Sequence, residues 1–303
     1  MSNATSTIRN SELAETNPVG SASGRRLMRA IAAQAMSRGQ AFQASHVGRG
    51  NLGDGIDPFL QIDHFFMREP TFPPHPHAGF SAVTYLFEDS EGAFTNRDTM
   101  SDGDAVLIQP GDLHWTQAGS GMVHEETPVE PGKVCHGLQM FVNLAAADKF
   151  SKPQAFHLDS ADIPTFTGLK GQRVRVVAGE AFGLSSPLKT LKPVTVLDTF
   201  LPAGEQIEHT LLLGHSAFVW VIDGAGTFGS DRQALSANEA GLFEQAEGAA
   251  VAQAGSQGLH YVLFSGSPIG EPIVSQGPFV MNSSDQIQQV RASYLAGEMG
   301  VLN

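Results

Sequence analysis

Two short runs of histidine and glutamate, about fifty residues apart, carry residue types that bind transition metals. His75 and His77 flank Pro76, and Glu126 follows His124 by two positions. Side chains at positions i and i+2 of a strand share a face and lie roughly 6–7 Å apart, so each pair can close on one ion. Three imidazoles and one carboxylate suit Fe, Ni, Mn, Co, Cu or Zn better than Ca or Mg. If two strands bring both pairs together, the sequence predicts a mononuclear metal site with open coordination positions.

An isolated pair of histidines at this spacing is more often a surface feature, and Pro76 also fits an exposed edge strand or loop. The second pair favours metal binding, because it repeats the spacing and adds a carboxylate. An apolar, β-rich stretch at 83–87 follows the first pair and favours it further. His209 and His215, in the second half of the chain, are six residues apart. We expect structural or surface roles for these two histidines.

Length, composition and charge restrict the classes of protein to which the chain can belong. The 303 residues are enough for one large or two medium domains, and 41% apolar with 16% charged residues indicate an ordered globular protein. The 18 basic and 31 acidic side chains give a formal charge of −13, which argues against direct binding to nucleic acid or an anionic membrane. The single cysteine, Cys135, excludes an intramolecular disulfide and fits a reducing compartment. No apolar run approaches the length that spans a bilayer.

The N-terminal stretch 1–24 is polar and rich in Ser, Asn, Thr and Gly, which predicts a disordered leader. Arg25 and Arg26 resemble the start of a twin-arginine export signal, but Arg29 and Gln34 interrupt the short stretch that follows. We therefore interpret this stretch as structural and expect a cytoplasmic protein. Residue propensity alone predicts a helix over 25–45.

Strand signals dominate from about residue 40 to 280, with turn residues every 8–12 positions, which is typical of an all-β barrel or sandwich. A similar order of strands and turns occurs at 83–112 and again at 217–242, which indicates two tandem barrels. We place the first barrel at 25–150 and the second at 151–303. A C-terminal helix is predicted at 284–296, with Ser284 as its N-cap and Ile287, Val290 and Leu295 at near-helical spacing.

Several runs together resemble the pirin family, whose members belong to the cupin superfamily and consist of two jelly-roll barrels. They are DPFL (57–60), HPHAGF (75–80), VTYL (83–86), PGDL (110–113), Trp115, AGSG (118–121), His124, Glu126, HGLQ (136–139), VNL (142–144) and GPFVMN (277–282). These runs span most of the chain beyond the leader. The resemblance implies the same fold here: two tandem cupin barrels, all-β, with a short C-terminal helix.

The resemblance also implies one divalent metal ion in the N-terminal barrel and none in the C-terminal barrel. Its ligands are expected at His75, His77, His124 and Glu126, with iron the first choice and Ni, Mn, Co, Cu or Zn as alternatives. Ser81 occupies the position of a glutamate ligand in typical cupin motifs, so Glu126 is expected to supply the carboxylate instead. For His114, a role beside the ligands, a surface position and a ligand role all remain open.

Two activities are associated with pirins. The first is cleavage of flavonols such as quercetin by dioxygen at the 2,3-bond, in which Glu126 is expected to accept the proton of the flavonol 3-hydroxyl. Phe80 and Trp115 are candidates to shape the pocket, with core packing as the alternative. The second is a non-enzymatic, metal- or redox-dependent regulatory role through a partner protein, and the acidic charge is compatible with docking to a basic protein face. A different cupin-type reaction is the third hypothesis.

Overall fold

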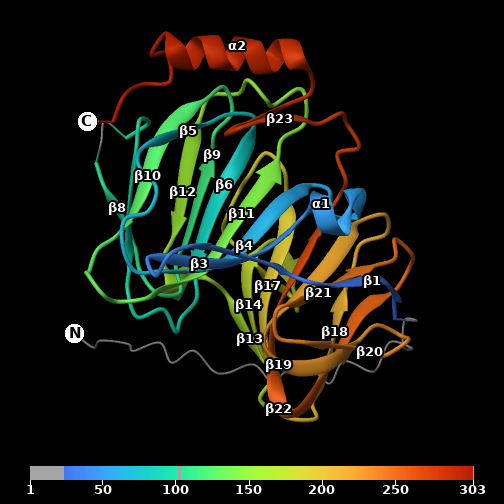
Figure 1. Ribbon diagram of the computed structural model, residues 1–303. Coiled ribbons are helices and arrows are strands. Elements are labelled where there is room, and N and C mark those ends of the chain that lie inside the picture. Colours follow the sequence, from blue (N-terminus) through green and yellow to red (C-terminus); the bar gives the residue numbers. More distant parts are fainter. Residues whose placement is uncertain (1–23, 102–103, 303) are drawn as a thin grey trace, which may run out of the picture.

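A computed structural model describes residues 24–101 and 104–302 of the chain. Two β-barrels lie side by side, and a helix near the C-terminus lies across one end of the first barrel (Figure 1). The all-β fold with two barrels and a short C-terminal helix is therefore confirmed. The leader predicted at 1–24 lies, apart from Gly24, outside the described residues.

The first barrel is built from two antiparallel sheets. One has seven strands in the order β12-β9-β6-β11-β4-β3-β2, and the other has four in the order β5-β10-β7-β8. A short helix α1 (Arg49–Leu52) and the 3-10 turn η1 (Asp54–Ile56) connect β3 to β4. The strand bounds are β2 (Gln34–Arg38), β3 (Phe42–Gly48), β4 (Phe59–Met67), β5 (His75–His77), β6 (Phe80–Leu86), β7 (Phe94–Asp98), β8 (Val106–Ile108), β9 (Leu113–Gln117), β10 (Met122–Pro128), β11 (Cys135–Asn143) and β12 (Gln154–Leu158).

The second barrel is one nine-stranded sheet that folds over on itself. Its main order is β1-β21-β19-β22-β17-β14-β13, while β18 pairs with β22 and β20 pairs with β19. The 3-10 turn η2 (Ser160–Asp162) and the hairpin β15–β16 accompany it. The strand bounds are β1 (Leu27–Ala32), β13 (Thr165–Thr167), β14 (Arg173–Ala178), β15 (Glu180–Ala181), β16 (Leu184–Ser185), β17 (Val194–Leu201), β18 (Gln206–Thr210), β19 (Ser216–Phe228), β20 (Gln233–Ser236), β21 (Glu239–Phe243) and β22 (Ala249–Gly266).

Strand pairing in the two barrels follows one repeated plan. The order β5-β10-β7-β8 of the first barrel corresponds to β18-β22-β19-β20 of the second, and β9-β6-β11-β4 corresponds to β21-β19-β22-β17. The long strand β19 corresponds to β6 and β7 together, and the long strand β22 corresponds to β10 and β11 together. The stretches 83–112 and 217–242, in which the sequence predicts a repeat, hold corresponding strands.

Each barrel takes one strand from the other half of the chain. β1 pairs with β21 of the second barrel, and β12 pairs with β9 of the first.

The helix predicted over 25–45 is wrong, because this stretch forms β1, β2 and most of β3. Its Ala, Met and Gln residues favour a helix locally, but burial of Leu27 beside Phe243 and the hydrogen bonds of two sheet edges outweigh that propensity. A domain boundary near residue 150 stays a prediction.

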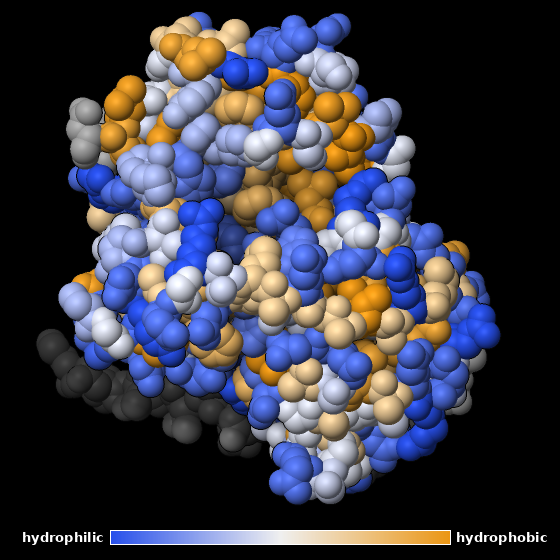
Figure 2. All heavy atoms as spheres, in the orientation of Figure 1, coloured by the Kyte–Doolittle hydropathy of each residue, from blue (hydrophilic) through white to orange (hydrophobic). Residues whose placement is uncertain are grey.

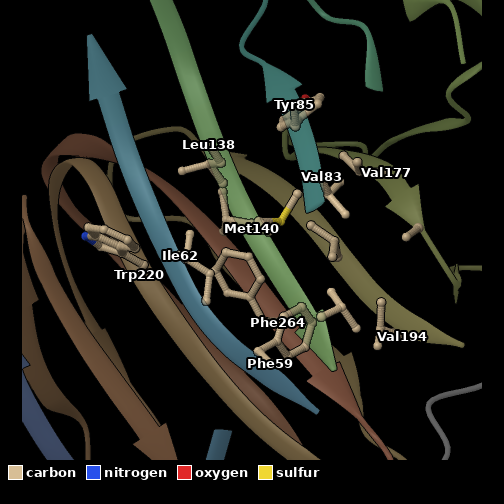
Figure 3. Close-up of a cluster of buried hydrophobic side chains, with 14 of the residues drawn as sticks. Phe59, Ile62, Val83, Tyr85, Leu138, Met140, Val177, Val194, Trp220 and Phe264 are labelled. Atoms are coloured by element: carbon tan, nitrogen blue, oxygen red, sulfur yellow. The ribbon is translucent and has the colours of Figure 1, made fainter. Parts of the chain in front are cut away.

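The largest apolar cluster lies between the two barrels. Figure 3 shows Phe59 and Ile62 of the first barrel in one cluster with Trp220 and Phe264 of the second. The ring of Phe59 meets those of Phe218 and Phe264 edge-on, each with centroids 5.5 Å apart. Such edge-to-face pairs add to the free energy of apolar burial. The two barrels therefore share one continuous apolar core.

The C-terminal tail packs against the first barrel. It comprises the hairpin β23 (Val274–Gln276) and β24 (Phe279–Met281) and the helix α2 (Ser284–Leu295). The predicted helix is confirmed, although Ser283 rather than Ser284 caps it, through a hydrogen bond from the backbone N–H of Gln286. Ile287 and Val290 are buried on the barrel, whereas Leu295 is 74% exposed.

Hydrophilic residues cover much of the face drawn in Figure 2, with apolar residues in small groups between them. None of the described helices is long and apolar enough to cross a membrane.

Candidate metal centre

Three of the four predicted ligands converge in the first barrel. β5 pairs with β10 in antiparallel register, so that His75 lies opposite His124 and His77 opposite Met122. One nitrogen from each of the three imidazoles lies within 4.8 Å of the others, and the ring centroids are 4.7–4.9 Å apart. Two neighbouring strands thus bring together the three histidines that the sequence singled out.

Burial keeps these imidazoles neutral. It lowers the pKa of His77 to about 3, with the neighbouring His75 as a smaller cause. It also lowers the pKa of His124 well below the ordinary value, and that of His75 to a lesser degree. A metal ion binds the neutral imidazole, and no proton has to leave these rings at neutral pH. The cluster is therefore in the protonation state that ion binding requires.

Hydrogen bonds orient two of the three rings. The Nδ1 of His75 donates to the carbonyl of Pro73 at 3.0 Å, and the Nδ1 of His124 lies 3.1 Å from the Oδ1 of Asn96. Asn96 in turn donates its Nδ2 to Asp98 at 3.1 Å, which fixes the amide so that its oxygen faces the ring. With Nδ1 engaged, the lone pair of Nε2 is free in both rings. These partners could not be predicted from the sequence, because they depend on which strand pairs with β10.

The fourth predicted residue, Glu126, lines the same cavity but lies outside the close group of histidines. Both of its carboxylate oxygens are within hydrogen-bond reach of the Thr84 hydroxyl, at 2.6 and 2.7 Å, and Gln139 lies 2.9 Å from the same hydroxyl. Removal from bulk water raises the pKa of Glu126 to about 7, against the opposing effect of Thr84. The carboxylate can thus exchange a proton near neutral pH, and its role as a ligand stays a prediction.

A cavity of about 230 Å³ opens beside the three histidines. Its wall is mainly apolar and aromatic, and it includes Phe42, Phe65, Met67, Phe72, Phe94 and Phe141. Gln61, Asp63 and Gln139 add a few polar groups, and Asp63 is held by His46 at 2.6 Å. An apolar wall with a few convergent polar groups is typical of a site for a small organic molecule. This lining suits an aromatic compound.

The aromatic candidates from the sequence lie behind this wall. Phe80 is buried against His77 and Phe141, with ring centroids 5.1 and 4.6 Å away. Trp115 belongs to the apolar cluster between the barrels. Both residues therefore act as packing, and Phe80 supports the metal centre from the side.

Further histidines lie outside the group. His114 is buried in β9 beside His157 of β12, and both of its ring nitrogens lack a partner among the residues described. A second cluster joins His157 to Asp112 and Asp159. The carboxylate of Asp112 already accepts hydrogen bonds from the backbone N–H groups of Gln109 and Ser160, so it holds in place the loops that contain these two residues. The described part of the second barrel holds no comparable group of three ligand side chains.

Comparisons with known proteins identify the family of this chain. A family model described as Pirin matches residues 31–142, and one described as Pirin C-terminal cupin domain matches residues 196–300. A pirin-like protein of Solanum lycopersicum is 37% identical over 279 residues, covering 91% of this chain and 93% of the relative. The chain belongs to the pirin family. Human (Homo sapiens) pirin is 35% identical over 246 residues, covering 80% of this chain and 82% of its own.

The pirin fold is also found among solved structures. The crystal structure of a quercetin 2,3-dioxygenase from Acinetobacter baumannii superposes with a TM-score of 0.82 at 26% identity, covering 94% of this chain and all of that one. The resemblance stated from the sequence is thereby confirmed at the level of family and two-cupin fold.

Proposed function

We propose that this pirin is a metal-dependent dioxygenase that cleaves a flavonol-type ring, in the manner of quercetin 2,3-dioxygenase. The observation that carries the proposal is the joint position of three neutral histidines, a buried carboxylate and an aromatic-lined cavity. The likeness to the Acinetobacter baumannii enzyme supports it, because that likeness extends over nearly the whole chain.

The residues present fit a transition metal ion. The Nδ1 of His77 is buried without a hydrogen-bond partner among the residues described. In His75 and His124 the orienting hydrogen bonds are at Nδ1, so Nε2 is available to the ion. His75, His77 and His124 would hold the ion, and Glu126 is the proposed fourth ligand. Imidazole and carboxylate together suit iron first, then Ni, Mn, Co, Cu or Zn. When bound, the ion supplies a Lewis acid for the substrate oxygen and a site for dioxygen chemistry.

The chain itself supplies a proton acceptor and a shaped pocket. Glu126 follows His124 by two positions on β10, so it faces the cavity beside the histidines. Thr84 provides a single hydrogen bond to the carboxylate, which leaves lone pairs to accept the proton of the flavonol 3-hydroxyl. The phenylalanines of the wall hold the rings of the substrate and exclude water. Glu126 then keeps the proton on its oxygen while the substrate reacts.

The test measures metal and turnover on one preparation of the full chain. We expect close to one ion per chain and flavonol loss that requires dioxygen. Glu126→Gln should lower turnover by roughly 10²–10⁴-fold, the range of general base catalysis, with a smaller effect on flavonol binding. Glu125→Gln is the matched control, because Glu125 points away and its carboxylate is bonded to Arg97 at 2.7 Å.

Two outcomes would contradict the proposal. Undiminished turnover in Glu126→Gln would remove this residue from the mechanism. Metal-loaded protein without flavonol turnover would favour the regulatory alternative, in which the same site controls binding to a partner protein.

A further inference from the structure

A row of polar side chains crosses the part of the first-barrel cavity wall that the seven-stranded sheet provides. Its four members lie directly opposite one another in the register of neighbouring strands. Across β3, β4, β11 and β6 they are His46, Asp63, Gln139 and Thr84. Directly opposite residues project from the same face of a sheet. This face is the one that borders the cavity, because Asp63 and Gln139 line the cavity. These four residues form the polar row.

The neighbouring rows on the same face are almost entirely apolar. Residues two positions away along each strand form these rows, because side chains alternate between the two faces of a sheet. One row consists of Ala44, Phe65, Gly137 and Leu86, and the other consists of Gly48, Gln61, Phe141 and Ala82. Gln61 is the single polar member of these two rows. A ligand that packs on the aromatic rings of this wall therefore meets polar groups mainly along one line.

The two ends of the polar row carry different groups. At one end the hydroxyl of Thr84 donates to Glu126, the proposed proton acceptor, at 2.6 Å. At the other end the Nδ1 of His46 donates to the Oδ1 of Asp63, also at 2.6 Å. Asp63 lies two strands away from Thr84, which corresponds to roughly 10 Å between the two backbones. A ligand with one polar group at Glu126 therefore reaches Asp63 only through a second polar group at its remote end.

The carboxylate of Asp63 is accessible from the cavity and has acceptor positions to spare. The side chain is 15% exposed and lines the cavity. Its Oδ1 accepts from His46, whereas the nearest donor to Oδ2 is the Nε2 of Gln61 at 3.4 Å, which is longer than a typical N–H···O bond. The two oxygens of a carboxylate offer about four acceptor positions and no donor. Asp63 therefore selects a ligand group that donates a hydrogen bond.

We propose that Asp63 determines substrate specificity in the first barrel, because its carboxylate accepts a hydrogen bond from a phenolic hydroxyl on the substrate ring farthest from Glu126. The aromatic rings of Phe42 and Phe65 in the same wall favour a phenol over an aliphatic alcohol. His46 is a positioning residue, since its hydrogen bond holds the carboxylate in place. The identity of the ring system rests on the proposed function. The preferred substrate is then a flavonol with a hydroxyl on an outer ring.

The test measures flavonol affinity of the metal-loaded full chain by fluorescence titration without dioxygen, so that binding is separated from turnover. The probes 3,7-dihydroxyflavone and 3,4′-dihydroxyflavone carry their second hydroxyl on one outer ring or the other. Each is compared with the methyl ether of that hydroxyl, which cannot donate, and 3-hydroxyflavone has neither group. We expect one dihydroxyflavone to bind roughly tenfold more tightly than its ether. Asp63→Asn keeps the shape but removes the charge, so it should reduce this advantage by about threefold to tenfold and leave the affinity for 3-hydroxyflavone unchanged.

Asp54→Asn is the matched control, because Asp54 is an exposed aspartate outside the cavity and is bonded to Arg49. It should leave the advantage of the hydroxyl unchanged. His46→Ala should reduce the advantage as well, because the carboxylate of Asp63 loses the hydrogen bond that holds it. A metal content close to one ion per chain in every variant shows that the metal centre is intact.

The role of Asp63 is overturned if neither dihydroxyflavone binds more tightly than its ether, or if Asp63→Asn weakens all the probes equally, as a purely structural role would. An Asp63-dependent advantage without dioxygen-dependent turnover supports this role and contradicts the proposed dioxygenase. Turnover without such an advantage does the reverse, and no binding of any of these flavonols contradicts both. If Asp63→Asn does not fold, the comparison of each probe with its ether in the unaltered chain and in His46→Ala decides the question.

Discussion

Gly79 lies where the C-terminal tail crosses the strand that carries His75 and His77, and we expect Gly79→Ala to displace the tail. The φ of Gly79 is +83°, and an added Cβ would lie 1.9 Å from the carbonyl oxygen of Val280 and 3.0 Å from the sulfur of Met281. No side-chain rotation relieves the first contact, because it is with backbone. Val280 therefore has to move away from the barrel.

The cost follows from the contacts that are lost. Alanine in the left-handed region costs roughly 1–2 kcal/mol. Movement of Val280 breaks its N–H bond to the carbonyl of Ala78 at 3.0 Å and removes its carbonyl from the Lys149 ammonium, also at 3.0 Å. Each buried group left unpaired costs about 1–3 kcal/mol, partly offset where water enters. We expect the free energy of unfolding to fall by about 3–6 kcal/mol.

Gly39→Ala is the matched control, since Gly39 has a φ of +64° and no atom within 4 Å of the added Cβ. It should cost only the roughly 1–2 kcal/mol of backbone strain. Urea denaturation of the two variants gives the difference, and limited proteolysis within 274–302 reports whether the tail is released. Equal destabilisation by both substitutions, with an uncut tail, would refute the reasoning.

Three further predictions follow from the site and the fold. His124→Ala should lose the bound metal while His209→Ala keeps close to one ion per chain, and equal loss in elemental analysis would contradict a single site. Burial lowers the pKa of Lys149 from 10.5 to about 8, so between pH 8 and 10.5 the unfolded chain binds more protons at this group than the folded chain does. The contribution of Lys149 therefore makes the free energy of unfolding rise with pH across this range. Lys149→Met should flatten that rise in urea denaturation measured from pH 8 to 10.5, and an unchanged slope would exclude this lysine as its source. A chain that ends near residue 150 lacks β12 and the tail that covers Ala78 and Val123, so it should be insoluble or metal-free. A soluble, metal-loaded fragment would show that the first barrel folds and binds metal without these segments.

The sequence predicted those parts of the site that depend on local spacing. Alternation along a strand puts His75 beside His77, and His124 on the same face as Glu126, whatever the rest of the chain does. The partners that orient and enclose these side chains could not be predicted. Asn96 and Thr84 reach the site from strands 28 and 42 residues away from their partners, and no local rule gives the register of such pairings.

In the fold too, features that depend on local signals could be predicted, and features that depend on pairing between distant strands could not. Turn spacing and apolar runs were enough for two barrels and a terminal helix, because those signals are local. The strand β1 was missed, since its residues prefer a helix and its partner β21 lies in the other half of the chain. His209 was expected to be structural or exposed, and its burial beside an open cavity depends on the path of the loop at 179–193.

The exchange of strands between the barrels determines when each barrel can be completed during synthesis. β1 leaves the ribosome before the other described strands, yet its partner β21 emerges more than 200 residues later. The sheet of the first barrel likewise waits for β12, and the strand of His75 and His77 is covered only when the final residues of the tail have emerged. A nascent chain therefore cannot finish one barrel before it starts the other, in contrast to domains that fold one after another from the N-terminus. The histidines acquire their final surroundings only after the tail that contains β24 has been translated.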